Sequence, residues 1–316
     1  MKNYITDVEG LRVGHCHDEN IGKGVTVIIA EEGATPGVDV RGSAPGTRET
    51  DLIESEKLVD KVHAVVLSGG SAYGLDASSG VMQYLEEKEI GFNTPYGLVP
   101  VVSQAVIYDL NSGDPKKRPD KQMGYKACIS SENSKIERGC VGAGFGATVS
   151  KTLGWDYAVK SGLGSYSIKL GDLVVSAMVC VNALGDIYEG DKQLTGPYDI
   201  TNNRMYSSLE IIKESKIGFT NTNTTIGVVA TNATLTKAQA NKLAQVSHNG
   251  YARAIRPVHT MSDGDTIFAL ATNKINEENF DLILMLAVEV IEASIVDAVK
   301  SAKSNKFYPS IKSINK

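Results

Sequence analysis

The chain reads Thr222-Asn223-Thr224-Thr225-Ile226-Gly227-Val228-Val229-Ala230-Thr231 where a polar run changes into an apolar, β-type run. This places Thr224 at the entrance to a buried strand. A threonine hydroxyl is a nucleophile only when a base removes its proton, and no histidine lies within twenty residues of Thr224. If the bond between Asn223 and Thr224 were cut, the new α-amine, with an ordinary pKa near ~8, would supply that base. The alternative is that both residues simply belong to a loop before the strand.

Two acidic residues further along the chain support the chemical interpretation. Asp263 and Asp265 flank Gly264, and a strand is predicted over Thr266–Thr272. Asp-Gly alone signals a turn, but a second Asp at the start of a strand is unusual because acidic residues are depleted in strands. If the strand begins early, both carboxylates point to the same side. They would then be able to hold a protonated amine and a hydroxyl in position.

Further segments share one family pattern. They are Gly10–His15, Val40–Glu49, Leu67–Asp76, Val141–Gly144, Val181–Ala183, the Asn223–Thr224 junction and Ala252–Thr260. Together they resemble the L-aminopeptidase/D-esterase family, which includes the β-aminopeptidases and the nylon-oligomer hydrolases. The resemblance covers nearly the whole chain. It implies a four-layer αββα sandwich of the N-terminal-nucleophile-hydrolase type and a precursor that cleaves itself before a Ser or Thr.

Carried over position by position, the resemblance makes Thr224 the nucleophile and Asn223 the last residue of the α-chain. The single hydrolase domain 1–316 would then become an α-chain 1–223 and a β-chain 224–316. Asn182 matches the asparagine that binds the oxyanion. The resemblance also implies a homo-oligomer, a tetramer in the family.

Four further site residues follow from the same resemblance. Asp263 and Asp265 match the acidic pair that contacts the nucleophile, although the first of these is a serine in the β-aminopeptidase branch. Lys151 and Tyr108 resemble the lysine and tyrosine near the nucleophile in the nylon-oligomer branch. The threonine nucleophile with Asp-Gly-Asp therefore resembles the nylon-oligomer branch more than the β-aminopeptidase branch. It leaves the substrate open among α-peptides, β-peptides, D-amino acid amides and ω-amino acid oligomers.

Composition sets limits on the other possibilities. The 316 residues carry a net charge of −5 with no basic patch, so we expect no nucleic-acid partner. The first residues contain no apolar signal region, and no apolar run approaches the ~20 residues that span a bilayer. The four cysteines are scattered without a CxxC pair, which indicates reduced thiols. We expect a cytoplasmic protein without a membrane partner.

Hydrophobic patterning predicts a mixed α/β fold with helices outside stacked sheets. The predicted strands are Gly24–Ile29, His63–Leu67, Ser165–Leu170, Leu173–Ala183, Ile226–Thr231 and Thr266–Thr272. The predicted helices are Thr50–Lys61, Ser71–Lys88, one beginning after the capping box at Thr236, and Phe280–Ala302. Gly171-Asp172 joins two of these strands as a hairpin, and such antiparallel pairing argues against an all-parallel, doubly wound sheet.

Several shorter patterns have simpler explanations. Gly142–Ala147 fits a dinucleotide-binding pattern, but we interpret it as close backbone packing. His15–Asp18 crowds its potential ligands too closely for a metal site, so we expect neither cofactor nor metal. Gly70 and Ser71 open a predicted helix whose amides would face the active site, and we assign both to substrate binding. His259 is interpreted as an ordinary loop or interior histidine.

The sequence therefore predicts an autoprocessed N-terminal-threonine amidohydrolase. It would cleave small peptides or amino-acid amides through an acyl-enzyme. One alternative is an endo-type hydrolase of ω-amino acid, nylon-like oligomers. An alternative of another class is an unprocessed, non-catalytic protein that binds a small molecule.

Overall fold

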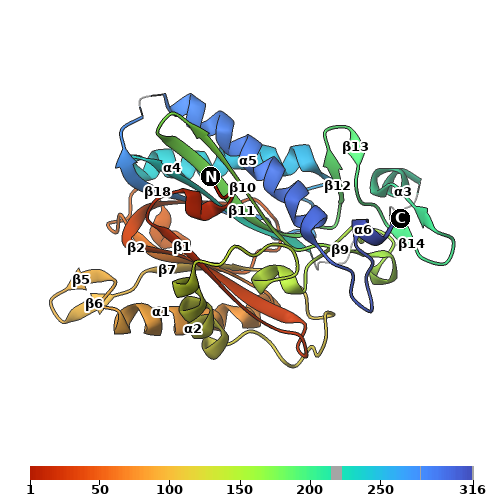
Figure 1. Ribbon diagram of the computed structural model, residues 1–316, viewed down its shortest axis with the longest axis horizontal. Helices are drawn as coiled ribbons and strands as arrows, with labels where there is room; N and C mark the ends of the chain where they lie inside the picture. Colours follow the sequence, from red (N-terminus) through yellow and green to blue (C-terminus); the bar gives the residue numbers. More distant parts are fainter. Residues whose placement is uncertain (215–222, 278, 315–316) are drawn as a thin grey trace.

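The protein is built from two stacked sheets that one long strand, β2 (Lys23–Val40), joins together (Figure 1). The computed structural model describes residues 1–214, 223–277 and 279–314. The first part of β2 pairs with β1 and β4, and its last part pairs with β18. The pairing register shifts between Ile29 and Ala34, and Gly33 there has a φ of +75°. A bulge of this kind bends a strand, which lets β2 pass from one sheet to the other.

The N-terminal sheet consists of β2 with β1 (Leu11–Asp18), β3 (Thr47–Arg48), β4 (Val62–Ser68) and β7 (Val102–Val106). The C-terminal sheet consists of the end of β2 with β10 (Leu163–Leu170), β11 (Leu173–Asn182), β16 (Thr224–Ala233) and β18 (Thr266–Ile275). β16 runs parallel to β18 and β4 parallel to β7, whereas the other neighbours are antiparallel. The sheets are therefore mixed.

Two pairs of helices cover the outer faces of the sheets (Figure 1). α4 (Lys237–Ala254) and α5 (Phe280–Ser301) lie over the C-terminal sheet, while α1 (Ala77–Glu87) and α2 (Lys121–Ser130) lie over the N-terminal sheet. Three apolar cores separate the four layers. Along β11, Val175 faces the core under the helices and Val174 faces the core between the sheets. Burial on both faces explains why this strand is apolar throughout, and the predicted αββα sandwich is confirmed.

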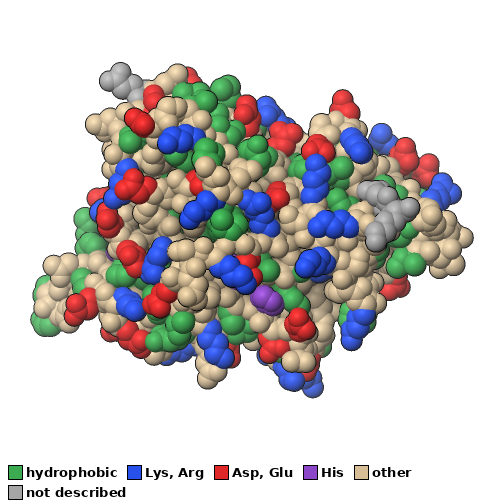
Figure 2. All heavy atoms as spheres, viewed as in Figure 1, with side chains coloured by type: hydrophobic (Ala, Val, Ile, Leu, Met, Phe, Trp, Pro, Cys, Tyr) green, Lys and Arg blue, Asp and Glu red, His purple; other side chains and the backbone are tan. Residues whose placement is uncertain are grey.

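Smaller elements complete the chain. The short strands are β5 (Phe92–Thr94), β6 (Gly97–Val99), β8 (Thr148–Val149), β9 (Val159–Lys160), β12 (Asp186–Glu189), β13 (Lys192–Gln193), β14 (Tyr198–Asp199), β15 (Arg204–Met205) and β17 (Ile255–Arg256). The short helices are η1 (Ile5–Asp7), η2 (Asp51–Ile53), η3 (Ser71–Asp76), η4 (Ser131–Asn133), η5 (Gly142–Phe145), η6 (Trp155–Tyr157), α3 (Ser208–Glu214) and α6 (Ile311–Ile314). No helix within the described ranges is long and apolar enough to cross a bilayer. Acidic and basic side chains are interspersed over the face in Figure 2.

The helix predicted over Thr50–Lys61 is wrong, because only the turn η2 forms there. The ammonium group of Lys237 on α4 donates to the carbonyl oxygens of Leu52, Lys57 and Val59 at 3.0–3.1 Å. These carbonyls are therefore bound by a side chain from a distant helix instead of by a helix of their own. A tertiary contact overrides the local pattern.

The helix predicted over Ser71–Lys88 begins as the 3₁₀ helix η3 and becomes α-helical only at Ala77. Its small residues do allow a close approach between helices. A Cβ on Gly80 would lie 1.8 Å from the carbonyl oxygen of Lys121, and one on Gly124 would lie 2.0 Å from that of Ala77. The glycines therefore let α1 and α2 pack backbone to backbone.

Candidate active site

Strand pairing brings the distant candidate residues to one edge of the C-terminal sheet. Thr224 is the first residue of β16 and lies opposite Asn182, the last residue of antiparallel β11. β18 is parallel to β16, and Ile226 pairs with Thr266. The start of β18, preceded by the loop that carries the two aspartates, therefore lies beside the start of β16. Thr224, Asn182 and this loop meet although they are far apart in the sequence.

The carbonyl group between Asn223 and Thr224 is held from two sides. The Thr224 hydroxyl donates a hydrogen bond to the carbonyl oxygen of Asn223, and the main-chain N–H of Gly264 donates to the same oxygen at 3.1 Å. The main-chain N–H of Asn223 donates to the carbonyl oxygen of Ser262 at 3.2 Å. The hydroxyl therefore lies against the bond that would be cut, and a backbone donor polarises its carbonyl.

The two aspartates are both buried but have different partners. Asp265 accepts from the main-chain N–H of Thr225 at 2.8 Å through Oδ1, and from Nδ1 of His259 at 2.8 Å through Oδ2. Asp263 accepts through Oδ2 from the N–H and hydroxyl of Thr260, at 2.9 and 2.6 Å. Its Oδ1 is buried and has no hydrogen-bond partner among the described residues.

The condition under which both carboxylates would point to the same side, an early start of the strand, is not met. β18 begins at Thr266, so Asp263 and Asp265 lie in the preceding loop and the alternation of a strand does not apply to them. Three backbone amides hold this loop in place: the N–H groups of Arg41 and Gly42 donate to the carbonyl of Asp265, and that of Ala44 donates to the carbonyl of Asp263. The segment 41–44, part of the family pattern, thus supports the acidic loop.

Asn182 and Lys151 form a buried polar cluster. Its Nδ2 donates to the carbonyl oxygen of Tyr108 at 3.0 Å. Its Oδ1 accepts from the N–H of Thr148 at 3.1 Å and from Nζ of Lys151 at 3.2 Å. Nζ of Lys151 also donates to the main-chain carbonyl of Asn182 at 3.0 Å and lies 4.9 Å from the centre of the Trp155 ring. These contacts fix the orientation of the Asn182 amide.

Burial moves the pKa values of two side chains at this site toward neutral pH. Burial lowers the pKa of Lys151 to about 7, against the attraction of Asp263. Burial, with a smaller contribution from the charge of Asp265, raises the pKa of Asp263 to about 6. Both groups therefore exchange protons near neutrality, as expected of acid–base groups in an active site.

A pocket of about 100 Å³ opens beside the Asn223–Thr224 bond. Ser71 and Tyr108 line it, and Tyr108 stacks on Trp155 with 6.4 Å between the ring centres. Its remaining walls are small or apolar: Ala44, Pro45, Gly46, Ala72 and Val106.

The main-chain N–H groups of Gly70 and Ser71 have partners outside the pocket beside Thr224. The Gly70 N–H donates to Oδ1 of Asp109 at 2.6 Å, and the Ser71 N–H donates to the carbonyl of Ile107 at 3.0 Å. Acceptors in the segment that follows β7 therefore bind both N–H groups. Gly70 does not line the pocket beside Thr224, whereas Ser71 does.

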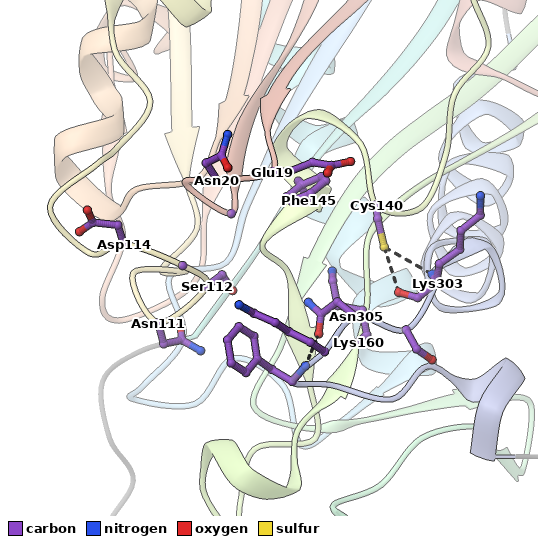
Figure 3. A pocket seen from close by; sticks show the side chains of 15 residues that line it. Glu19, Asn20, Asn111, Ser112, Asp114, Cys140, Phe145, Lys160, Lys303 and Asn305 are labelled. Atoms are coloured by element: carbon purple, nitrogen blue, oxygen red, sulfur yellow. Dashed lines mark hydrogen bonds between the residues drawn. The ribbon is translucent and has the colours of Figure 1, made fainter.

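A larger pocket of about 770 Å³ lies elsewhere (Figure 3). It is bounded by residues 303–307 near the end of the chain, the β1–β2 turn and the loop after β7, and none of the proposed catalytic residues lines it. Its buried Lys160 already donates to the carbonyl oxygens of Gly144, Ala147 and Ser161. Pocket size therefore does not locate the chemistry. Among the described residues there is also no cluster of His, Cys, Asp and Glu suited to a metal ion.

Sequence reasoning missed two groups at the site, the main-chain N–H of Gly264 and the imidazole of His259. A Cβ on Gly264 would lie 2.8 Å from the hydroxyl oxygen of Thr224 and 2.5 Å from the carbonyl oxygen of Ala44. The Asp-Gly-Asp pattern predicts a turn. It does not predict that Gly264 lies this close to Thr224 and Ala44, because that proximity depends on strands from other parts of the chain.

Comparisons with known proteins identify the family of this chain. The sequence profile of peptidase family S58 matches residues 3–309. The chain belongs to this family. It is accordingly a hydrolase of peptide or amide bonds.

Relatives in the family carry two kinds of name. A protein of Mycobacterium leprae described as an uncharacterized aminopeptidase is 42% identical over 294 residues, which cover 86% of this chain and 79% of the relative. A 6-aminohexanoate-oligomer endohydrolase of Paenarthrobacter ureafaciens is 33% identical over 276 residues, covering 85% of this chain and 75% of the relative. The aminopeptidase-named relative is thus more similar to this chain than the oligomer hydrolase.

Solved structures show the same fold. A β-aminopeptidase from a Burkholderia species superposes with a TM-score of 0.72 at 21% identity, covering 96% of this chain and 87% of that one. The L-aminopeptidase D-Ala-esterase/amidase of Ochrobactrum anthropi gives 0.72 at 19% identity, with 97% and 89% covered, and is described as a variant of the Ntn-hydrolase fold. The predicted N-terminal-nucleophile-hydrolase architecture is confirmed.

Proposed function

We propose that this S58 hydrolase cleaves itself between Asn223 and Thr224 and then acts as an aminopeptidase on small peptides or amino-acid amides. The observation that carries the proposal is the placement of the Thr224 hydroxyl against the Asn223 carbonyl, whose oxygen accepts from the Gly264 N–H at 3.1 Å. The single hydrolase unit would become the chains 1–223 and 224–316.

Self-cleavage begins with attack of the Thr224 hydroxyl oxygen on the Asn223 carbonyl carbon. The C–N bond then breaks, the Thr224 nitrogen takes up the proton that the hydroxyl loses, and the acyl group is left as an ester on the Thr224 oxygen. Water then hydrolyses the ester and leaves a carboxylate on Asn223 and a free amine on Thr224. We assign the transfer of this proton to Lys151 or Asp263, which the family resemblance places at the nucleophile and whose pKa values are about 7 and about 6.

After cleavage, the free amine of Thr224 acts as the base for its own hydroxyl, which attacks the substrate carbonyl. The developing oxyanion takes the position of the Asn223 carbonyl oxygen, within reach of the Gly264 N–H. The family resemblance makes Asn182 the second donor, and its bond to the carbonyl of Tyr108 uses only one of its two Nδ2 hydrogens. Lys151 holds the amide of Asn182 and adds positive charge beside it.

Asn223 shows how a substrate residue would lie, since it is the acyl group of the first ester formed. Its main-chain nitrogen faces the carbonyl of Ser262 at 3.2 Å. A substrate with a free α-amine would place that amine there, next to Asp263. Asp263 is the better acceptor of the two aspartates, because both oxygens of Asp265 already have donors whereas Oδ1 of Asp263 has none among the described residues.

The fold supports joint assembly of both chains after cleavage. β16 of the β-chain pairs with β11 of the α-chain, and β18 pairs with β2. Fragments held this way stay together without a disulfide, and the cysteines are free. We further propose a homo-oligomer, a tetramer as the family resemblance implies, in the cytoplasm. Fragments that elute separately on native gel filtration would contradict this arrangement.

The test begins with two substitutions at one position. Thr224→Ala should remain a full-length chain on a denaturing gel, whereas Thr224→Ser, which keeps a hydroxyl, should still yield two fragments. Cleavage of the alanine variant at this bond would rule out Thr224 as the agent. The absence of cleavage in the wild-type protein would favour the non-catalytic alternative.

Substrate class is tested with the processed enzyme. Alanine amides and peptides with a free α-amine should be hydrolysed faster than their N-acetylated forms, because acetylation removes the charge that Asp263 accepts. β-Peptides, D-amino acid amides and 6-aminohexanoate oligomers are assayed in the same way for comparison. Preferential cleavage of the 6-aminohexanoate oligomers would instead support the endohydrolase alternative, which the 33% identical relatives favour.

A further inference from the structure

His259 connects the catalytic edge of the sheet to helix α4 through Asp265. Both its main-chain N–H and its ring Nδ1 donate to Oδ2 of Asp265, at 3.3 and 2.8 Å. The other oxygen of Asp265 accepts from the N–H of Thr225, the residue directly after the nucleophile, at 2.8 Å. One carboxylate thus joins the imidazole to the backbone that carries Thr224.

The backbone of His259 is arranged to make both contacts. Its φ is +56°, in the left-handed region that residues other than glycine seldom adopt, although Asn, Asp and His do so more often than most. This conformation turns the main-chain N–H and the ring toward the same oxygen. A strained conformation at a catalytic loop is commonly maintained because it positions a functional group.

The ring of His259 is also fixed from the opposite side. It stacks on Tyr251 of α4 with 6.0 Å between ring centres and 24° between planes, and meets His248 edge-on at 4.9 Å. His248 donates from Nε2 to the carbonyl of Asp39 at 3.1 Å, and burial lowers its pKa to about 3, so it is neutral beside the His259 ring. Nε2 of His259 is buried without a partner among the described residues, which makes Nδ1 the nitrogen that bears the hydrogen.

We propose that His259 is a positioning residue: its Nδ1–H holds the Asp265 carboxylate on the Thr225 N–H and thereby fixes the Thr224 nucleophile for self-cleavage and turnover. The proposal rests on the function proposed above. His259 acts through Asp265, whose carboxylate accepts from both the His259 ring and the Thr225 N–H. Small displacements of a reacting group have large effects on rate, about 10²-fold for ~1 Å.

Two substitutions separate the hydrogen bond from the packing of the ring. His259→Asn retains a donor, because Nδ2 of asparagine can take the place of Nδ1, and asparagine tolerates a positive φ. His259→Phe retains a ring on Tyr251 but has no donor. If the hydrogen bond matters, the asparagine variant should process itself and turn over within about threefold of wild type, while the phenylalanine variant should lose about 10- to 100-fold in kcat with KM little changed.

The measurements are the rate of fragment formation, kcat and KM on an alanine amide, and the melting temperature of each variant. An active phenylalanine variant with an inactive asparagine variant would show that the ring only packs, and the proposal would be wrong. Wild-type rates in both variants, or equal losses in both, would also overturn it. If His259→Phe is insoluble, His259→Leu serves as the variant without a donor. A wild-type protein that neither processes itself nor hydrolyses any amide would instead refute the proposed function.

Discussion

Replacing Gly264 by alanine should slow self-cleavage strongly without preventing folding. The new Cβ would lie 2.5 Å from the carbonyl oxygen of Ala44 and 2.8 Å from the hydroxyl oxygen of Thr224. Carbon atoms need more than 3 Å from such neighbours, so the loop must move by about 0.5–1 Å. The Gly264 N–H, which donates to the scissile carbonyl at 3.1 Å, moves with it. Loss of one oxyanion donor typically costs about 10²–10³ in rate, and the overpacking destabilises the fold by about 1–3 kcal/mol.

The assay follows the conversion of full-length Gly264→Ala chain into fragments on denaturing gels, with thermal melting alongside. Gly171→Ala in the β10–β11 turn provides the control, because Gly171 also resists substitution, with a φ of +57°, but its Cβ would point into open space. That variant should lose about 1–2 kcal/mol and process normally. If Gly264→Ala forms fragments at the wild-type rate, the Gly264 N–H does not assist cleavage and the reasoning is refuted.

Three further predictions follow from the geometry. Asn182→Ala should lower kcat of the processed enzyme by about 10²–10³ and change KM far less, because its bond to the oxyanion strengthens in the transition state; steady-state kinetics measure this. The raised pKa of Asp263, about 6, means that its carboxylate is ionised above that pH. The ratio of kcat/KM for free-amine substrates to kcat/KM for their N-acetylated forms should therefore fall as pH decreases through 6, and this fall in the ratio should disappear in processed Asp263→Asn. Lys237→Met leaves three backbone carbonyls of segment 52–59 without their donor and should cost about 1–3 kcal/mol, measured by urea unfolding.

The sequence by itself determined the elements whose signals are local. The β10–β11 hairpin, with its Gly171-Asp172 turn, and the capping box that starts α4 depend on residues a few positions apart, and both form as predicted. The long apolar runs of β11 and β16 were predictable as buried strands because both faces pack against a core. Thr224 stood out as a potential nucleophile for a local reason too, since a polar run ends there at the mouth of an apolar strand.

Only the tertiary structure decided which groups surround that threonine. The antiparallel register of β11 and the parallel register of β18 bring Asn182 and the Asp263–Asp265 loop to Thr224, and no local pattern encodes a register between distant strands. The same limit explains the wrong helix over Thr50–Lys61, whose carbonyls are taken by a lysine more than a hundred residues away. It also explains why the sequence gives no sign of the contact between His259 and Asp265. Hydrogen bonds and electrostatic shifts depend on distance in space, which the order of residues along the chain does not specify.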